Sequence, residues 1–459
     1  MIVRTRFRRA LPSPSRALVA AFALAAAIGS VLLALPASNA DGAWHLGIDR
    51  LFLATSAVCV TGLDPIGVGA SLSRFGLAVL CVLVQVGGIG IMTAGTFLFI
   101  VFGRSLTVTE ERSVSSSLGV VSPAAVRRTL VGTFAFTFAW EALGACVLAW
   151  RLCTVFPEWS AAKAACAGAF FAEMSFCNAG FSLFPNGFAP LMGDAPVVAA
   201  SIVLSLVGGI GFVVHARILS LRPWRKNRLE RGRLPLQARL VLEGLAVVVA
   251  LDLAVYAALE ANGAWKGLGT GRTVMTALFQ AFSTRSAGFS SVPVSSFGAA
   301  TILFTMAMMF VGAAPGSTGG GVKTTTISVL FATVKAMFAG QETPELHFRS
   351  LPRRAVNDAI AVLAVGLAIV FATSFALFAI ERPEPGGVAA LVFEAVSAFS
   401  NNGLEIEGTT AGLSTASKVV VVLAMFAGRL GPMALVLTLF KPGSFDKTKR
   451  FPEENVMIG

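Results

Sequence analysis

Four short segments of the chain end in the same kind of phrase, a glycine followed by leucine or phenylalanine. The glycines are Gly62, Gly180, Gly288 and Gly403, and their nearly regular spacing indicates one unit used four times in a single polypeptide. The chemistry of such a phrase comes from the main chain, because glycine permits backbone angles that turn successive carbonyl oxygens to one side. Rings of carbonyl oxygens can replace the hydration shell of a cation. Four such segments around one axis would therefore line a cation pore.

The candidate ion-binding residues are each repeated glycine and the two residues before it. They would bind a cation through their backbone carbonyl oxygens. They are Val60, Thr61 and Gly62; Asn178, Ala179 and Gly180; Ser286, Ala287 and Gly288; and Asn401, Asn402 and Gly403. A single glycine of this kind would more simply form a tight turn after a helix. Four glycines in the same register argue against that alternative.

Composition predicts a polytopic membrane protein. Hydrophobic residues make up 55% of the chain and charged residues 13%, and the mean hydropathy is +0.78. A soluble fold of this composition would have too few polar residues to cover its surface. Apolar stretches long enough to span a bilayer lie near residues 17–38, 74–102, 129–150, 196–214, 240–260, 355–380 and 415–440, and an eighth, 298–338, is interrupted. Shorter stretches near 46–59, 164–177, 272–285 and 388–400 end at the repeated glycines, which predicts re-entrant half-helices.

These elements predict an all-α membrane protein made of four tandem repeats. Each repeat is a spanning helix, a re-entrant pore loop and a second spanning helix, so that eight transmembrane helices surround one pseudo-fourfold pore. The predicted repeats cover residues 1–103, which include a basic arm, 104–222, 223–340 and 341–459, which include a cytoplasmic C-terminal tail. Each half-helix would aim its partially negative C-terminal end at the axis, which favours cations over anions.

The basic residues predict the orientation in the cell membrane. Most lysines and arginines fall in the N-terminal arm, the loops between repeats and the C-terminal tail, so both termini are expected in the cytoplasm. The net charge of +12 follows from this asymmetry, and it favours membrane lipid headgroups or an acidic cytoplasmic partner over nucleic acid. The basic arm, apolar run and residues 36–40 also resemble a secretory signal, but cleavage there would remove the outer helix of repeat one.

The sequence offers no candidate for catalysis. The six cysteines show neither a Cys-x-x-Cys pair nor metal-ligand spacing, and the three histidines are isolated. Nothing resembles a Ser-His-Asp, His-Glu-x-x-His or phosphate-loop arrangement. We therefore expect a protein that is not an enzyme and holds no covalent cofactor.

A second motif interrupts the apolar stretch of repeat three. Glycines and a proline in residues 312–323 cannot sustain a helix, and irregular backbone at membrane depth must be buried in protein or line water. The segment is therefore a candidate gate beneath the filter, with a passive kink as the alternative. The candidate gate residues are Gly312, Pro315, Gly316, Ser317, Thr318, Gly319, Gly320, Gly321 and Lys323, together with Arg429 from repeat four.

Charged side chains near this pathway carry further predictions. A cationic side chain in the middle of a span is costly, so we expect Arg429 to raise an electrostatic barrier and to donate to carbonyls of the gate loop. An ion pair between helices is the alternative. At the outer side, Asp64, Asp194, Glu405 and Glu407 could concentrate cations, although exposed carboxylates also serve solubility.

Residues 54–63 and 283–289 resemble the first and third filter segments of the Trk/Ktr/HKT superfamily of potassium transporters. The resemblance extends to residues 85–90, 208–211 and 428–432, and the chain looks most similar to the membrane subunit of Ktr-type systems. It implies K+ as the transported ion, selectivity resting on the filter glycines and an intramembrane gating loop. It further implies a homodimer, a cytoplasmic ring of nucleotide-binding regulatory subunits and Na+ as an activator.

The resemblance leaves two alternatives open. Relatives that carry sodium often have serine at the first filter glycine, so four glycines favour potassium; the polar Asn401 and Asn402, however, depart from the family pattern. A sodium-selective or Na+-coupled member of the same superfamily is one alternative. The other is a symporter of an organic solute, which would show broken helices but would not need the glycine phrase four times.

Overall fold

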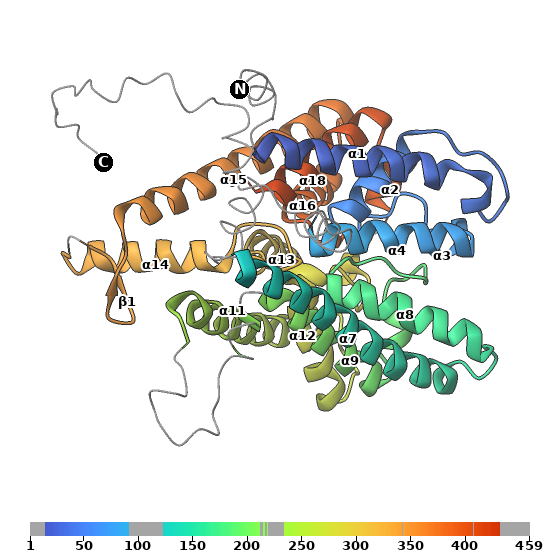
Figure 1. Ribbon diagram of the computed structural model, residues 1–459, viewed down its shortest axis with the longest axis horizontal. Coiled ribbons are helices and arrows are strands. Elements are labelled where there is room, and N and C mark those ends of the chain that lie inside the picture. The colour runs from blue at the N-terminus through green and yellow to red at the C-terminus, as the bar shows by residue number, and fades with distance from the viewer. Residues whose placement is uncertain are drawn as a thin grey trace, which may run out of the picture.

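The computed structural model describes residues 14–90, 123–211, 214–215, 218, 234–341, 343–406 and 408–431, and the statements below concern these residues. They are mostly helical (Figure 1). The first two groups of elements are α1 (Pro14–Ala34), η2 (Pro36–Ser38), α2 (Ile48–Val58), α3 (Val68–Ser71) and α4 (Arg74–Ile89), then α7 (Pro123–Val155), α8 (Ala161–Cys177), η3 (Ala189–Leu191) and α9 (Ala195–Ile210). The third group is α11 (Leu236–Glu260), α12 (Thr270–Phe282), η4 (Ser283–Ala287), η5 (Val294–Ser296), α13 (Ala299–Phe310) and α14 (Thr324–Phe338). The last is β1 (Glu345–Leu346), β2 (Arg349–Ser350), α15 (Arg353–Glu381), η6 (Pro385–Gly387), α16 (Val388–Ser400), α17 (Thr409–Gly412) and α18 (Thr415–Leu430).

Four short helices, which we call the inner helices, lie close to the predicted half-helices. They are α2, α8, α12 and α16, and each packs against the long helix that precedes it, namely α1, α7, α11 and α15. The inner helices are deeply buried: every residue of α16 from Phe393 to Ser400 is buried. The long helices α1, α11 and α15 instead expose large apolar side chains such as Leu24, Val247 and Phe371. Such apolar outer faces are what a lipid environment requires.

The contacts between neighbouring groups follow a cyclic order. The helix after each inner helix packs against the inner helix of the next group: α4 on α8, α9 on α12, α13 on α16, and finally α18 back on α2. The fourth group is therefore in contact with the first, although the two are far apart in sequence. This closed order brings the C-terminal ends of the four inner helices toward one another.

Three described helices are long and apolar enough to cross a membrane, namely Val131–Val155, Leu236–Glu260 and Arg353–Glu381. The apolar stretches near 74–102, 196–214 and 415–440 begin as helices α4, α9 and α18. These helices end at Gly90, Gly211 and Gly431, whose φ angles are 85°, 93° and 81°. Glycine adopts these angles without steric cost, so each apolar run breaks at its glycine.

The interruption predicted in the stretch near 298–338 is confirmed. This stretch forms α13 and α14, separated by residues 311–323, which we call the unwound segment. Between α14 and α15, strands β1 and β2 form a small antiparallel hairpin in which Glu345 pairs with Ser350 and Leu346 with Arg349. The expectation of purely helical structure missed this hairpin, which projects with α14 from the body (Figure 1).

Candidate functional site

Each inner helix ends by turning sharply at the predicted filter segment. In three groups the turn uses a residue other than glycine in the left-handed region, namely Val60, Asn178 and Asn401, with φ of 54°, 59° and 52°. Each lies two positions before its glycine. Serine side chains support two of the turns, because Ser56 Oγ accepts from Gly62 N and Ser397 Oγ from Gly403 N, both at 3.1 Å.

The third segment departs from the other three. Residues Ser283–Ala287 form a π-helical turn, and Gly288 alone takes the left-handed conformation, with φ of 68°. The side chain of Tyr256, from α11, lies behind this turn and bonds the hydroxyls of Thr284 at 2.7 Å and Thr305 at 2.8 Å. Single π-helical turns occur often at functional sites.

The four glycines form a closed ring of contacts, which we call the glycine ring. A Cβ added at Gly62, Gly288 or Gly403 would overlap the carbonyl oxygen of Ala179, Asn402 or Thr61, respectively. A Cβ added at Gly180 would lie 3.2 Å from the carbonyl oxygen of Ala287. In every case the oxygen belongs to the residue just before the next glycine in the cyclic order. Glycine is therefore required here by the close approach of neighbouring main chains.

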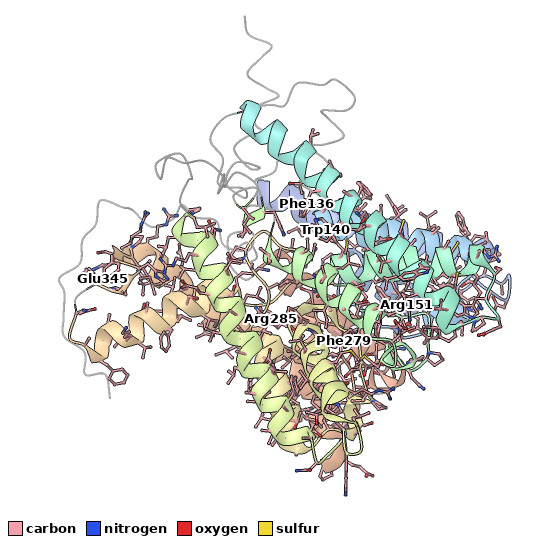
Figure 2. The ribbon with its side chains drawn as sticks, turned by 90° about the horizontal axis from the view of Figure 1, so that it is seen from below. Phe136, Trp140, Arg151, Phe279, Arg285 and Glu345 are labelled. Atoms are coloured by element: carbon pink, nitrogen blue, oxygen red, sulfur yellow. The ribbon has the colours of Figure 1, made fainter. Side chains whose placement is uncertain are left out.

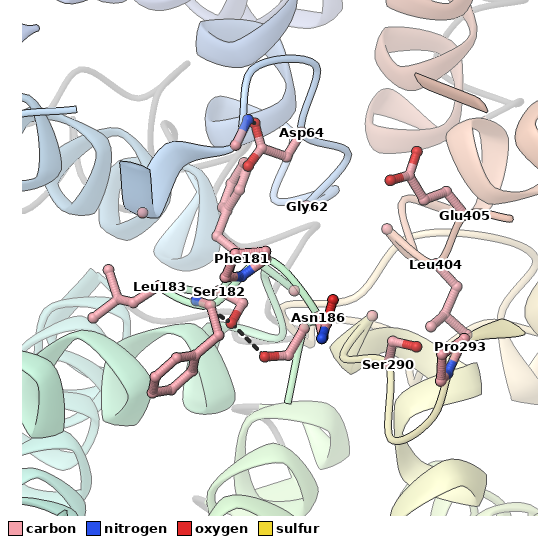
Figure 3. Close-up of a pocket in the computed structure, with 18 of the residues that line it drawn as sticks. Gly62, Asp64, Phe181, Ser182, Leu183, Asn186, Ser290, Pro293, Leu404 and Glu405 are labelled. Atoms are coloured by element: carbon pink, nitrogen blue, oxygen red, sulfur yellow. Dashed lines mark hydrogen bonds between the residues drawn. The ribbon is translucent and has the colours of Figure 1, made fainter. Parts of the chain in front are cut away.

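A pocket of about 380 Å³ opens on one side of the glycine ring, and all four glycines line it. Its wall also includes Asp64, Ser182, Ser290 and Glu405, which come from different groups of helices (Figure 3). The other predicted filter residues do not line this pocket: Val60, Thr61, Asn178, Ala179, Ala287, Asn401 and Asn402 are buried in the protein, and Ser286 lies in the π-helical turn. Within the candidate filter, the pocket is thus bordered only by glycine.

The predicted outer carboxylates divide into two kinds. Asp64 and Glu405 line the pocket, although Asp64 also accepts backbone hydrogen bonds from Ile66 at 3.0 Å and Val68 at 2.6 Å. Asp194 instead caps α9 and pairs with Arg151 at 2.5 Å, a hydrogen bond that holds the pKa of Asp194 below its usual range. Asp194 is not part of the pocket wall, and Glu407 lies outside the described residues.

The amides of Asn401 and Asn402 are committed to protein partners. The Asn401 side chain donates to Thr61 Oγ1 at 2.9 Å and to the Met425 carbonyl at 3.0 Å. The Asn402 side chain donates to two carbonyls of the third segment, Ser283 at 3.0 Å and Thr284 at 2.7 Å. The two polar side chains that depart from the family pattern, Asn401 and Asn402, therefore link the fourth segment to the first and third segments.

Because Asn402 joins two segments, Asn402→Ala should loosen the third segment. For the K+ pathway that the family resemblance implies, we expect the K+ over Na+ flux ratio to fall several-fold, since a buried side-chain hydrogen bond contributes about 1 kcal/mol and two are lost. Flux of both ions through purified protein in liposomes measures this ratio. Asn39→Ala is the matched control, because Asn39 is also buried and bonds backbone carbonyls, but between α1 and α2. An unchanged ratio in Asn402→Ala would contradict this role.

The unwound segment contributes no residue to the pocket wall that the described residues form, and it makes a closed loop. Its two ends are joined, because Gly312 N donates to the Val322 carbonyl at 2.9 Å and Val322 N donates to the Phe310 carbonyl at 3.2 Å. A Cβ added at Gly312 would overlap the carbonyl oxygen of Gly320. Pro315 and Ser317 are half-buried, Gly319 and Gly321 are buried, and Gly316 is exposed.

The middle of the unwound segment contacts the other groups. Thr318 Oγ1 accepts from Asn178 Nδ2 at 3.0 Å, and Gly320 is packed against Asn401. Arg429 donates to the carbonyl of Thr318 with one nitrogen and to the carbonyl of Gly87, in α4, with the other. The expected donation from Arg429 to the segment is therefore present in the geometry.

Lys323 also donates into the unwound segment. Its Nζ lies 2.7 Å from the carbonyl oxygen of Gly319 and 3.4 Å from that of Gly320. Both cationic side chains that were predicted at membrane depth therefore bind carbonyls of this one segment.

The sequence interpretation missed a third cationic side chain at this place, Arg285. It is 5% exposed, and its Nη2 lies 3.3 Å from the carbonyl oxygen of Gly312. A signal was available: three positions before the glycine, the other segments have Cys59, Cys177 and Ser400, which are all small. An arginine in a position otherwise held by small residues indicates a separate role.

Three comparisons relate the chain to known proteins. The sequence profile of the TrkH family, described as a cation transport protein, matches residues 8–447. Ktr system potassium uptake protein B of Bacillus subtilis is 32% identical, with 97% of each chain covered. Potassium/sodium uptake protein NtpJ of Enterococcus hirae is 30% identical, with 100% of each chain covered. The crystal structure of the potassium transporter TrkH from Vibrio parahaemolyticus superposes with a TM-score of 0.73 at 17% identity, over 95% of this chain and 87% of that one, which establishes a shared fold.

Proposed function

The chain belongs to the TrkH family of cation transport proteins, and from this premise we propose that it carries K+ into the cell through the glycine ring. The observation that carries this proposal is the closed order of the ring. Each glycine faces the carbonyl of the next segment, and the last segment meets the first. A closed ring of main-chain oxygens is what a dehydrated cation needs in place of its water.

In this mechanism the protein supplies oxygens and removes competing charge. The inner helices α2, α8, α12 and α16 direct their C-terminal ends toward the ring, and the partial negative charge there favours a cation. The amides of Asn401 and Asn402 are held by protein partners and would leave coordination to the main chain. Asp64 and Glu405 on the pocket wall would raise the local cation concentration.

Flux through such a pore is passive. With the pocket facing the outside and both termini in the cytoplasm, the inward-negative membrane potential contributes about 2.3 kcal/mol per charge per 100 mV. The pseudo-fourfold axis, the four repeats and the eight spanning helices belong to this proposal. They are supported by the cyclic contacts of the inner helices and by the fold shared with TrkH.

The unwound segment is the proposed gate. It lies on the other side of the ring from the pocket and contacts Asn178 of the second group and Asn401 of the fourth. Arg429 and Lys323 hold its carbonyls and place positive charge on the path of a cation. Movement of the segment away from these contacts would open the path.

The assembly is proposed by resemblance. Two of the relatives are named as components of a Ktr system, proteins B and D of Bacillus subtilis. We infer a homodimer in the lipid bilayer of the cell membrane, regulated by a cytoplasmic ring of nucleotide-binding subunits. Na+ would act as an activator of K+ uptake.

The proposed function predicts saturable uptake of K+ and Rb+ by purified protein in liposomes under an inward-negative potential. Uptake should depend on the protein, should be far smaller for Na+ alone, and should carry positive charge inward, which a voltage-sensitive dye records. Repeating the assay with added Na+ separates activation from competition. Absence of ion uptake by folded protein under all these conditions would reject the proposal.

A second candidate function is uptake of both K+ and Na+. It is favoured by the full-length similarity to a protein named as a potassium/sodium uptake protein. The two candidates differ in one result: comparable Na+ and K+ uptake at equal concentrations supports the second candidate, whereas a strong K+ preference supports the first.

A further inference from the structure

Arg285 lies at the junction between the third filter segment and the unwound segment. It is part of the π-helical turn that precedes Gly288, and its side chain reaches the carbonyl of Gly312, the second residue of the unwound segment. The equivalent positions in the other segments hold Cys59, Cys177 and Ser400, none of which could span such a distance. The third segment is therefore joined to the unwound segment by a charged side chain of its own.

The contact falls where the two ends of the unwound segment meet. Gly312 donates its N–H to Val322, so the hydrogen bond from Arg285 adds a constraint to the same residue. At 3.3 Å the bond from Nη2 is long, and Nη1 is buried without a hydrogen-bond partner among the described residues. Arg285 therefore uses only part of its capacity as a donor in this state.

A buried carboxylate on α11, that of Asp252, lies within electrostatic range of Arg285. Asp252 is fully buried, and neither of its oxygens has a hydrogen-bond partner in the part of the chain that the structure describes. Asp252 and Arg285 interact electrostatically, but no direct ion pair joins them in this state. A buried carboxylate without hydrogen bonds is costly, so a conformation in which Arg285 reaches Asp252 would be favourable.

Space for a small movement borders the guanidinium. A cavity of about 20 Å³ is lined by Arg285, by Asn178 and Ser205 of the second group, and by Ala313 of the unwound segment. Figure 2 shows Arg285 in the interior, beside the long helix α11. The surroundings of Arg285 thus connect the third segment, the unwound segment and α11.

We propose that Arg285 is a positioning residue with two alternative partners, the Gly312 carbonyl in the present state and the Asp252 carboxylate when the unwound segment moves. This inference rests on the proposed function of that segment as the gate. In the present state Arg285 holds Gly312 in place. When the segment moves, the pair of Arg285 with Asp252 stabilises the open arrangement and leaves the third filter segment supported.

The test uses two variants for which the proposal predicts opposite results. In Arg285→Lys the charge opposite Asp252 is kept while the shorter side chain no longer reaches Gly312, so basal K+ flux should rise roughly tenfold. In Asp252→Asn alone, Arg285 keeps Gly312 and loses its alternative partner, so basal flux should fall. A residue that only stabilises the fold would change flux in one direction, in proportion to the amount of folded protein.

Matched controls keep the test decisive. Arg151→Gln/Asp194→Asn removes a charged pair on α7 and α9 that lies away from Arg285 (Figure 2), and asparagine can still cap α9, so flux should be unchanged. Arg285→Gln/Asp252→Asn removes both proposed contacts of Arg285 together, so its basal flux should lie between those of Arg285→Lys and Asp252→Asn. This double variant replaces Asp252→Asn if the single variant fails to fold, and its flux should then lie below that of Arg285→Lys.

Each outcome of these assays has one meaning. Wild-type flux in folded Arg285→Lys and Asp252→Asn would overturn the two-partner role of Arg285, as would flux that changes in the same direction in both. Wild-type protein without any K+ flux would instead reject the proposed function itself. All assays use the full chain in liposomes, with the amount of monodisperse protein as the reference.

Discussion

Replacing Gly288 by serine is expected to remove most of the preference for K+ and most of the flux. A Cβ at this position would overlap the carbonyl oxygen of Asn402, which is one of the oxygens proposed to face the ion. Either that carbonyl or the third segment must move, and forced repacking of this kind costs about 1–3 kcal/mol. If that energy acts on one ion and not on the other, the preference for K+ over Na+ changes roughly five- to hundredfold. The ratio of Rb+ to Na+ uptake in liposomes measures the effect.

Substitutions at two other glycines distinguish backbone strain from the close approach of segments as the cause of this loss. Gly42 has the same φ of 68° as Gly288, but nothing lies within 4 Å of a Cβ added there, so Gly42→Ser tests backbone strain alone. It should leave the ion preference unchanged. Gly180→Ser should have an intermediate effect, because the added Cβ would lie 3.2 Å from the Ala287 carbonyl. Equal losses in Gly288→Ser and Gly42→Ser would show that the close approach of segments is not the reason.

Replacing Arg429 by glutamine should raise basal K+ flux more than any change at Arg285. Arg429 is joined both to Thr318 in the unwound segment and to Gly87 in the first group, so its loss frees the segment from two sides. Hydrogen bonds from charged groups contribute about 1.5–3 kcal/mol, which corresponds to roughly a ten- to hundredfold shift of a closed state toward an open one. Removal of the positive charge would also lower the barrier for a cation.

Lys335→Gln is the control for charge alone. Lys335 lies in α14, after the unwound segment, and its side chain is exposed. Its replacement removes one positive charge without touching the segment, and basal flux should stay at the wild-type level. Uptake kinetics unchanged in Arg429→Gln would exclude Arg429 as a support of the gate.

Sequence reasoning located the parts of the site that depend on local pattern. The repeated glycines Gly62, Gly180, Gly288 and Gly403 identified the turns, and the short apolar stretches before them identified the inner helices. Both signals are local, because each apolar stretch ends within a few residues of its glycine. The breaks at Gly90, Gly211 and Gly431 were missed. Apolar residues continue past each glycine, and composition alone does not reveal which glycine takes a positive φ.

Contacts between repeats could not be predicted from one sequence. The partners of Asn402 lie in the third segment, and the partner of Arg429 lies in the unwound segment, so their roles depend on tertiary structure. The π-helical turn at Ser283–Ala287 has no signature in residue preference. Arg285 and Asp252 lie on different elements, and their electrostatic interaction depends on how those elements pack.

The cyclic overlap in the glycine ring also bears on how such a chain can evolve. In a channel of four identical subunits, one codon change alters every corner of the pore at once. In the pore proposed above, the four segments are separate stretches of one chain, so a change would alter a single corner, and its effect would fall on an oxygen contributed by the adjacent segment. In such a pore, ion preference could change in small steps, each constrained by the close approach of the neighbouring segment.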